Sequence, residues 1–240
     1  MSDRATSNTA LQTEIQDFGD DALRRRTAAF PFVLVVIGTR PEAIKMAPVI
    51  RQLAALPGVK CQVCVTAQHR EIMDSVLHLF GIAPDYDLDI MREGNDLCDV
   101  ASGVMLGLRD VFKVARPNLV VVHGDTTTCM AATLAAFYHR IPIAHVEAGL
   151  RTFDLDAPFP EEANRKMTSQ IASLHLAPTS ISKANLVAEG IDPADIVVTG
   201  NTVIDALLAT AGKDLPFSDP ILEALAASGR QILLVTTHRR

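Results

Sequence analysis

The sequence has little of what would make a disulfide-bonded, repetitive or disordered chain. Only four of its 240 residues are cysteine, which is too few for a disulfide framework. Glycine and proline contribute 13 residues each, too few for a collagen-like or linker-dominated chain. Hydrophobic residues make up 48% and charged residues 21%, proportions typical of a globular protein. At about 150 residues per domain, such a chain is expected to form one to two domains.

The sequence also lacks an excess of positive charge and a long apolar run. Its formal net charge of −6 argues against a general nucleic-acid-binding surface, although a local basic pocket is compatible with it. The apolar stretch at 28–37 follows three arginines but is shorter than the about 20 residues that a membrane span needs. We therefore expect a cytoplasmic protein with no nucleic-acid or membrane partner. Residues 1–30 are expected to form a disordered tail.

Short apolar runs recur along the chain, with helical spacing of apolar residues between them. Several runs are continuously apolar, as expected for parallel strands covered on both faces. The predicted strands cover residues 33–37, 61–65, 119–123, 141–146, 174–177, 195–198 and 232–235. Helical spacing is clearest over 44–56, 72–80 and 127–138. This alternation predicts an α/β fold with a doubly wound parallel sheet.

The same pattern predicts how the chain is divided. Residues 31–200 contain enough strands and helices for one complete Rossmann-like domain. Residues 201–230 read as a helical connection, and 231–240 as the first strand of a truncated second domain. The C-x-x-C pair, Cys61 and Cys64, lies within a predicted strand, where its side chains point to opposite faces. We interpret both as small buried hydrophobic residues rather than as a redox pair.

In open α/β sheets, ligands bind beyond the carboxyl ends of the strands, so the residues that follow each strand are informative. After the first strand, Gly38 allows close backbone approach, and Arg40 and Lys45 lie near a helix start that can bind an anion. The Gly-x-x-x-x-Gly-Lys spacing of a P-loop is absent. Alone, this segment is a weak signal and is explained better by a surface ion pair.

Three carboxylates strengthen the prediction of a site. Asp125 and Glu147 follow two successive strands and should lie side by side, and Glu161 begins the next helix on the same side. Two of them have a structural alternative: Asp125 is a plausible helix N-cap, and Glu161 favours a helix dipole. Together, beside Arg40 and Lys45, they suggest a pocket that holds an anionic ligand and moves protons.

Other kinds of catalytic site find less support in the sequence. Metal sites usually show tight spacings such as H-E-x-x-H, and none is present, so we expect no metal. A serine nucleophile in a Gly-x-Ser-x-Gly turn is also absent.

Taken together, the motifs along the chain resemble those of the bacterial non-hydrolysing UDP-N-acetylglucosamine 2-epimerases. The matching segments are GTRPEAIKMAPVI (38–50), TAQHREIMDSVL (66–77), HGDTTT (123–128), HVEAGLRT (145–152), PFPEEANRK (158–166) and TGNTVIDAL (199–207). The last five residues, TTHRR, resemble the start of the family segment T-G-H-R-R-E, with Thr237 at the usual glycine. The resemblance covers residues 33–240.

The resemblance implies a fold and a reaction. The fold is the two-domain glycosyltransferase-B architecture, with the active site between the domains. The reaction is interconversion of UDP-GlcNAc and UDP-ManNAc, without metal or other cofactor, for surface polysaccharide precursors. UDP is eliminated to leave a 2-acetamidoglucal and is then added back. The resemblance also implies a homodimer, and little activity in this chain alone, because the family's second domain supplies most nucleotide contacts.

The resemblance further implies roles for individual residues. The catalytic residues are Asp125, Glu147, Glu161 and His238, the last beside the leaving diphosphate. The substrate-binding residues are Arg40, Lys45, Gln68, His69, Arg70 and Arg151. Those at 68–70 match a segment that contacts a second, regulatory UDP-GlcNAc in some family members. Which carboxylate serves which face of the sugar C2 stays open.

Two other functions remain as alternatives. A UDP-sugar glycosyltransferase of the same fold would need no proton removal at C2, and one base would suffice for it, so three carboxylates disfavour it. An inactive remnant that binds a sugar nucleotide is the non-enzymatic alternative.

Overall fold

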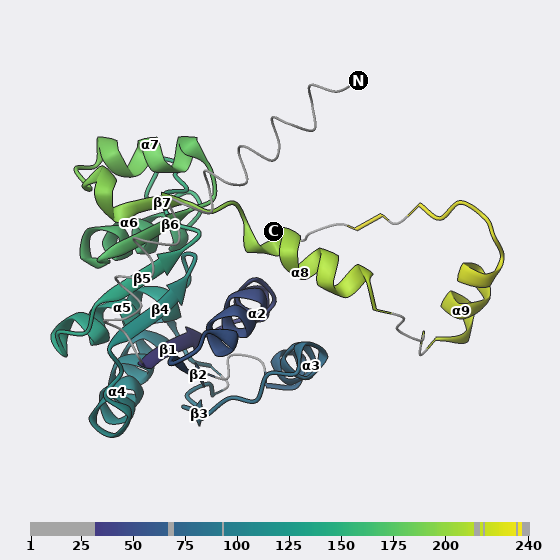
Figure 1. Cartoon of the computed structure of the whole chain (residues 1–240), viewed down its shortest axis with the longest axis horizontal. Helices are drawn as coiled ribbons and strands as arrows, with labels where there is room; N and C mark the ends of the chain where they lie inside the picture. The colour runs from purple at the N-terminus through teal and green to yellow at the C-terminus, as the bar shows by residue number, and fades with distance from the viewer. Residues whose placement is uncertain are drawn as a thin grey trace. The chain divides into compact units, whose positions relative to one another are not determined.

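The first compact unit is built on a seven-stranded parallel sheet that is flanked by helices (Figure 1). The computed structural model describes residues 32–66, 70–92, 94–213, 217, 219–233 and 235–236. The strand order is β3-β2-β1-β4-β5-β6-β7, and all neighbouring pairs are parallel. The strands are β1 (Phe32–Ile37), β2 (Lys60–Val65), β3 (Tyr86–Asp87), β4 (Leu119–His123), β5 (Ile143–Val146), β6 (Leu174–Ala177) and β7 (Ile196–Val198).

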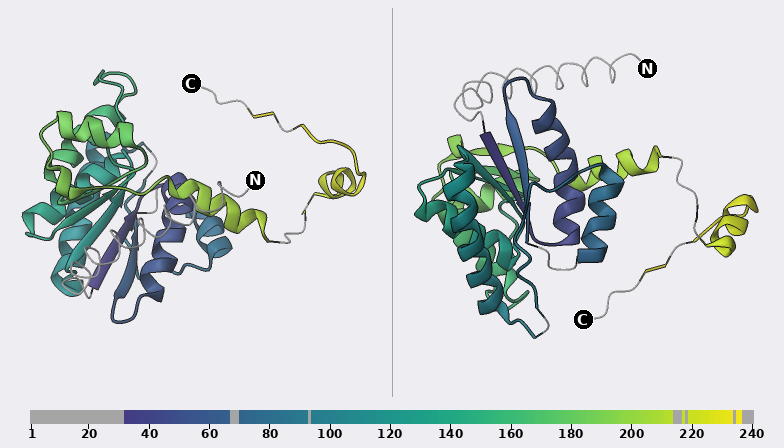
Figure 2. Two further views of the ribbon diagram at one scale, coloured as in Figure 1. Left: turned by 45° about the horizontal axis from the view of Figure 1, so that its top comes forward. Right: turned by 90° about the horizontal axis from the view of Figure 1, so that it is seen from below.

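Helices connect the strands and cover both faces of the sheet. They are α2 (Arg40–Ala55), α3 (Arg70–Phe80), α4 (Leu97–Ala115), α5 (Thr127–Tyr138), α6 (Glu161–Ile171), α7 (Ser180–Ala188) and the 3-10 helix η1 (Pro193–Asp195). Two further helices, α8 (Thr202–Ala211) and α9 (Pro220–Ala227), follow β7, and α9 lies within a second compact unit. Figure 2 shows α2 and α3 on one side of the sheet and α4 and α5 on the other. The doubly wound α/β fold is therefore confirmed.

Burial on both faces explains why the strands are continuously apolar. Along β1, Val33, Val35 and Ile37 pack with residues of α2 and α3. The alternate residues Leu34 and Val36 pack with α4 and α5 on the other face. Because successive side chains of a strand point to opposite faces, neither set can be polar without a polar group entering a core.

Most predicted elements are present, with a few differences at their ends. Six of the predicted strands are confirmed as β1, β2 and β4 to β7. The strand β3 was not predicted, because an element of two residues carries no periodic pattern. Within the helical connection predicted over 201–230, the structure has two separate helices, α8 and α9, and Gly212 follows the end of α8 directly.

The cysteines of β2 behave as small hydrophobic residues, as predicted. Cys64 is buried in the core with α4 and α5, and Cys61 packs on the opposite core. Burial raises the pKa of Cys61 to about 11 and that of Cys64 to about 12, and neighbouring aspartates add to both shifts. Both thiols therefore stay neutral and unreactive at ordinary pH.

The two ends of the chain are described less fully. Residues 1–30, predicted as a tail, lie outside the described residues. A second compact unit begins at Leu207 and contains α9. Its described residues at 231–233, 235 and 236 belong to no helix or strand, and the strand of a second domain predicted over 231–240 stays a prediction. A strand is held by the hydrogen bonds of a neighbour, and no described strand pairs with this segment.

No helix in the part of the chain that the structure describes is long and apolar enough to cross a membrane.

Candidate functional site

The candidate site lies where the turns after β1, β4 and β5 meet, at the reversal of strand order between β1 and β4. Glycines serve two of these turns in different ways, Gly38 by allowing close packing and Gly124 by its backbone conformation. A Cβ added to Gly38 would lie 2.4 Å from Oγ1 of Thr128, so the turn after β1 touches the first turn of α5. Gly124, directly after β4, has a φ of +70°, which glycine adopts at no steric cost.

A buried carboxylate, Glu42, ties together the two helices that begin at these turns. Thr39 caps α2, and the Glu42 carboxylate accepts hydrogen bonds from the backbone N–H groups of Gly38 and Thr39. The hydroxyl of Thr126, which caps α5, donates to the other Glu42 oxygen at 2.7 Å. Burial raises the pKa of Glu42 and outweighs these hydrogen bonds and the charge of His123.

Sequence analysis missed Glu42, although its spacing from Thr39 is that of a capping box. It also proposed Asp125 as the cap of α5, whereas the cap is Thr126. Asp125 therefore does not cap α5, so helix capping does not explain why an aspartate stands at this position.

Glu147 follows β5 directly and is held by two side chains from other elements. Nζ of Lys45 donates to both carboxylate oxygens, at 2.8 and 2.6 Å, and Nε2 of His123 lies 3.1 Å from Oε2. Glu147 has a φ of +63°, a conformation that is costly for any residue except glycine. Such strain is found where the surroundings fix a side chain for a function.

The same contacts decide the charge of Glu147. Burial raises its pKa, but hydrogen bonds from His123 and Lys45 and their positive charges outweigh burial and lower the pKa to about 2. Only 12% of the Glu147 side chain and 23% of the Lys45 side chain are exposed. Lys45 was predicted to bind substrate, and here it forms an ion pair with a predicted catalytic carboxylate.

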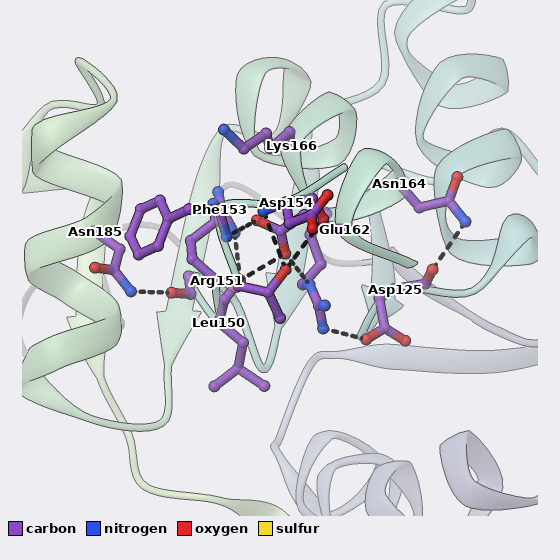
Figure 3. Close-up of polar contacts among 12 residues, drawn as sticks. Asp125, Leu150, Arg151, Phe153, Asp154, Glu162, Asn164, Lys166 and Asn185 are labelled. Atoms are coloured by element: carbon purple, nitrogen blue, oxygen red, sulfur yellow. Dashed lines mark hydrogen bonds and ion pairs between the residues drawn. The ribbon is translucent and has the colours of Figure 1, made fainter. Parts of the chain in front are cut away.

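Asp125, just after β4, lies in a different electrostatic environment. Nη1 of Arg165 donates to its Oδ2 at 2.7 Å, and the Asn164 amide donates to its backbone oxygen at 2.9 Å (Figure 3). Burial raises the pKa of Asp125. Arg165 opposes this shift, but the negative charges of Glu161 and Glu147 add to it, and the net pKa is raised.

Glu161 is the first residue of α6 and completes the group of carboxylates. Its Oε2 is buried without a hydrogen-bond partner among the described residues. A buried carboxylate oxygen without a hydrogen-bond partner is costly for the fold, so a structural role does not explain it. Because Glu161 contributes to the raised pKa of Asp125, the two carboxylates lie within electrostatic reach of each other. Asp125, Glu147 and Glu161 are therefore brought together as predicted.

The predicted substrate-binding residues are placed less uniformly. Arg40 is exposed at the first position of α2, with no hydrogen bond or ion pair to the described residues, and Arg70 begins α3. Gln68, His69 and His238 lie outside the described residues.

Arg151, predicted to bind substrate, contacts Glu189 and Ser169 in the folded chain, and its role in substrate binding stays a prediction. Its Nε and Nη2 donate to the Glu189 carboxylate at 2.9 and 2.6 Å, and Nη2 also donates to Ser169. Nη1 donates to the backbone oxygen of Leu150, and the side chain is 0% exposed. Arg151 therefore joins the turn after β5 to α6 and to the end of α7. Its position in the sequence motif did not reveal this direction of its side chain.

His145, inside β5, is a buried histidine that supports the site. Its Nε2 lies 2.7 Å from the backbone oxygen of Gly124, and because a carbonyl only accepts, Nε2 carries the proton. Burial lowers the pKa of His145 to about 3, and the hydrogen bond to Gly124 opposes this shift only in part. The imidazole is therefore neutral in the folded protein.

Replacing His145 with glutamine is expected to flatten the loss of stability in acid. Between pH 6.5 and about 3 the unfolded chain binds a proton at His145 that the folded chain does not, so the free energy of unfolding falls as the pH falls. The integrated effect is about 5 kcal/mol, because each pKa unit is worth about 1.4 kcal/mol. Urea unfolding at several pH values in this range measures it. The same substitution at the exposed His78 should leave the slope unchanged, and an unchanged slope in His145→Gln would contradict the prediction.

No group of three or more His, Cys, Asp or Glu side chains within the described ranges is arranged to hold a metal ion.

Comparison with known proteins places this site in a family. The sequence model for UDP-N-acetylglucosamine 2-epimerase matches residues 51–240. A probable UDP-N-acetylglucosamine 2-epimerase of Ralstonia nicotianae is 53% identical over 215 residues, covering 87% of this chain and 57% of the relative. The UDP-N-acetylglucosamine 2-epimerase of Escherichia coli strain K12 is 51% identical over 214 residues, with the same shares covered.

A solved structure agrees with these relatives. The crystal structure of UDP-GlcNAc 2-epimerase from Neisseria meningitidis bound to UDP-GlcNAc is 54% identical, with a TM-score of 0.73. The match covers 74% of this chain and 48% of that chain. The chain thus spans about half the length of the relatives it matches. On this sequence and fold evidence, the chain belongs to the UDP-N-acetylglucosamine 2-epimerase family.

Proposed function

We propose that this chain carries the acid–base groups of an enzyme that interconverts UDP-GlcNAc and UDP-ManNAc. The observation that carries the proposal is the opposite shift of two carboxylates that follow adjacent strands. The pKa of Glu147 is lowered to about 2, whereas that of Asp125 is raised. Titratable groups whose environments separate their pKa values are typical of paired acid and base roles.

Inversion at C2 requires a proton to leave one face of the sugar and another to arrive on the opposite face. A base takes the C2 proton, and its electron pair forms the C1–C2 double bond. This electron pair comes from the broken C2–H bond. The C1–O bond breaks at the same time, and UDP leaves with the electron pair of the C1–O bond. Re-addition of UDP to C1, with protonation of C2 from the other face, gives the epimer. Acid–base groups are therefore needed on both faces.

The site residues fit these roles as follows. Glu147, fixed by Lys45 and His123, is a permanent anion at neutral pH. Asp125, with its raised pKa, and Glu161, with a buried oxygen lacking a partner among the described residues, are the groups that hold and move the proton. We assign diphosphate binding to Arg40, and its exposure at the start of α2 supports this assignment.

Incorporation of solvent deuterium at C2 tests this proposal. UDP-GlcNAc is incubated in deuterium oxide with the chain and with a fusion of the chain, in register, to the remaining C-terminal part of the Escherichia coli relative. The fusion has the length of a whole family member. We expect the fusion to form UDP-ManNAc and to place deuterium at C2, as followed by proton NMR and mass spectrometry.

The same measurement separates the alternatives. A glycosyltransferase of this fold consumes UDP-GlcNAc only with an acceptor and leaves the C2 proton in place. An inactive remnant binds UDP-GlcNAc and shows neither product nor exchange. Either result in the folded fusion would overturn the proposal.

The proposal includes the setting of the enzyme. We propose that the protein works as a homodimer in the cytoplasm, on nucleotide sugars that supply surface polysaccharide precursors, as the family resemblance implies. Light scattering of the purified protein measures the oligomeric state.

A further inference from the structure

A continuous series of polar contacts joins the turn at 152–153 to Asp125. The backbone N–H groups of Thr152 and Phe153 each donate to the Glu162 carboxylate at 3.1 Å. Nε of Arg165 donates to the same carboxylate at 3.1 Å, and Nη1 of Arg165 donates to Asp125 at 2.7 Å. Figure 3 shows this series, with Glu162 between Phe153 and Asp125.

Burial distinguishes this series from an ordinary helix-surface ion pair. The Glu162 side chain is 0% exposed and that of Arg165 is 8% exposed, whereas Asp125, at the end of the series, is 31% exposed. Burying an ion pair is a weak source of stability, because desolvation offsets much of the attraction. Arg165 also reaches beyond its partner on α6 to a residue 40 positions earlier in the chain.

The shape of the guanidinium gives the series its direction. Nε and Nη1 of Arg165 bond two different carboxylates, so the planar group cannot rotate without losing one of them. The side-chain amide of the neighbouring Asn164 holds the Asp125 backbone oxygen at 2.9 Å. Both the backbone and the carboxylate of Asp125 are thus held by the first turns of α6.

We propose that Arg165 is a positioning residue that orients the Asp125 carboxylate and balances its charge, and that Glu162 conveys the conformation of the 152–153 turn to it. The catalytic meaning of this coupling rests on the proposed function. The coupling itself is a property of the folded chain and is measured without turnover.

The charged groups around Asp125 determine what each substitution should do. Glu161 on α6 and Glu147 after β5 disfavour its negative charge, and Arg165 and His123 favour it. On α5, burial raises the pKa of the Cys129 thiol well above its usual value, so that thiol stays neutral. Among the positive charges, Arg165 lowers the pKa of Asp125 most. The negative charge of Glu162, which is paired with the same guanidinium, partly cancels the charge of Arg165.

Two substitutions should therefore shift the titration of Asp125 in opposite directions. Arg165→Met removes the favourable charge, so the midpoint should rise. Glu162→Gln leaves the Arg165 charge without its second partner, so the midpoint should fall. If both residues only stabilised the fold, their loss would not produce shifts of opposite sign.

Carbon-13 NMR of the whole chain, labelled at aspartate carboxyl groups, measures these midpoints. The Asp125 signal is assigned by its absence in Asp125→Asn. Lys166→Met is the matched control, because it removes a positive charge from the next residue, 3.5 Å from Glu189 and with no contact to Asp125. We expect the control to leave the Asp125 midpoint unchanged.

The signs of the two shifts in the Asp125 midpoint test the proposal. A rise in Arg165→Met together with a fall in Glu162→Gln supports the proposal, and shifts of the same sign or no shift overturn it. If Arg165→Met does not fold, Arg165→Lys replaces it, and a smaller rise is expected because one ammonium cannot bond both carboxylates in the same geometry. A confirmed coupling without deuterium exchange in the fusion would refute the proposed function alone.

Discussion

Replacing Glu147 with glutamine is expected to slow deuterium incorporation at C2 by a factor of about 10² to 10³, the range found when one fixed electrostatic group is removed from an active site. The amide has the size of the carboxylate but carries no charge. It would present N–H groups towards Lys45 and His123, which now donate to Glu147. The substitution therefore removes the fixed anion of the site and leaves the Lys45 ammonium without its partner.

The measurement is the initial rate of exchange in the fusion protein at neutral pH, where Glu147 is ionised. Glu189→Gln is the matched control. Glu189 accepts two hydrogen bonds from Arg151, as Glu147 does from Lys45, but it makes no contact with Asp125 or Glu147. We expect this control to lower stability without a comparable effect on exchange. An exchange rate within threefold of the wild type in Glu147→Gln would restrict Glu147 to anchoring Lys45.

The sheet could be predicted because both of its faces are covered. Residues of β1 such as Val35 and Val36 pack on opposite cores, and this produces the continuous apolar runs that identify parallel strands. The strand β3 could not be predicted, because two residues show no pattern. The cap of α5 was also uncertain from sequence, because Asp125 and Thr126 are both favourable N-cap residues and only the backbone path chooses between them.

The proximity of the carboxylates could be predicted from the sequence, but the basic side chains that form ion pairs with them could not. Asp125 and Glu147 end neighbouring strands, so strand order alone places them together. The contact between Lys45 and Glu147 spans 102 residues, and it depends on how α2 packs on the sheet. Arg151 belongs to the same motif as Glu147, yet its side chain points into the interface with α6 and α7. Motif membership identifies a residue but not the direction of its side chain.

A substitution at Gly149 tests whether the turn after β5 is held against α7. Gly149 has a φ of +87°, and an added Cβ would lie 2.2 Å from the backbone oxygen of Ser182 and 2.8 Å from its carbonyl carbon. Both atoms belong to the backbone of α7, so no side-chain rotation relieves the clash. The Asn185 amide, also on α7, donates to the Gly149 oxygen at 3.0 Å and keeps the two segments together (Figure 3).

Gly149→Ala is therefore expected to lower the free energy of unfolding by about 4 kcal/mol or more, at the upper end for single substitutions. Gly190→Ala is the matched control, because Gly190 has nearly the same φ, +89°, but no atom within 4 Å of an added Cβ. That variant should lose only the conformational cost, about 1–2 kcal/mol. Urea unfolding followed by circular dichroism measures both, and the difference isolates the clash with α7. Equal losses would mean that α7 yields at no cost. In that case α7 would not hold the turn that contains Glu147 and Gly149. The positive φ of Glu147 would then be maintained by its contacts with Lys45 and His123 alone.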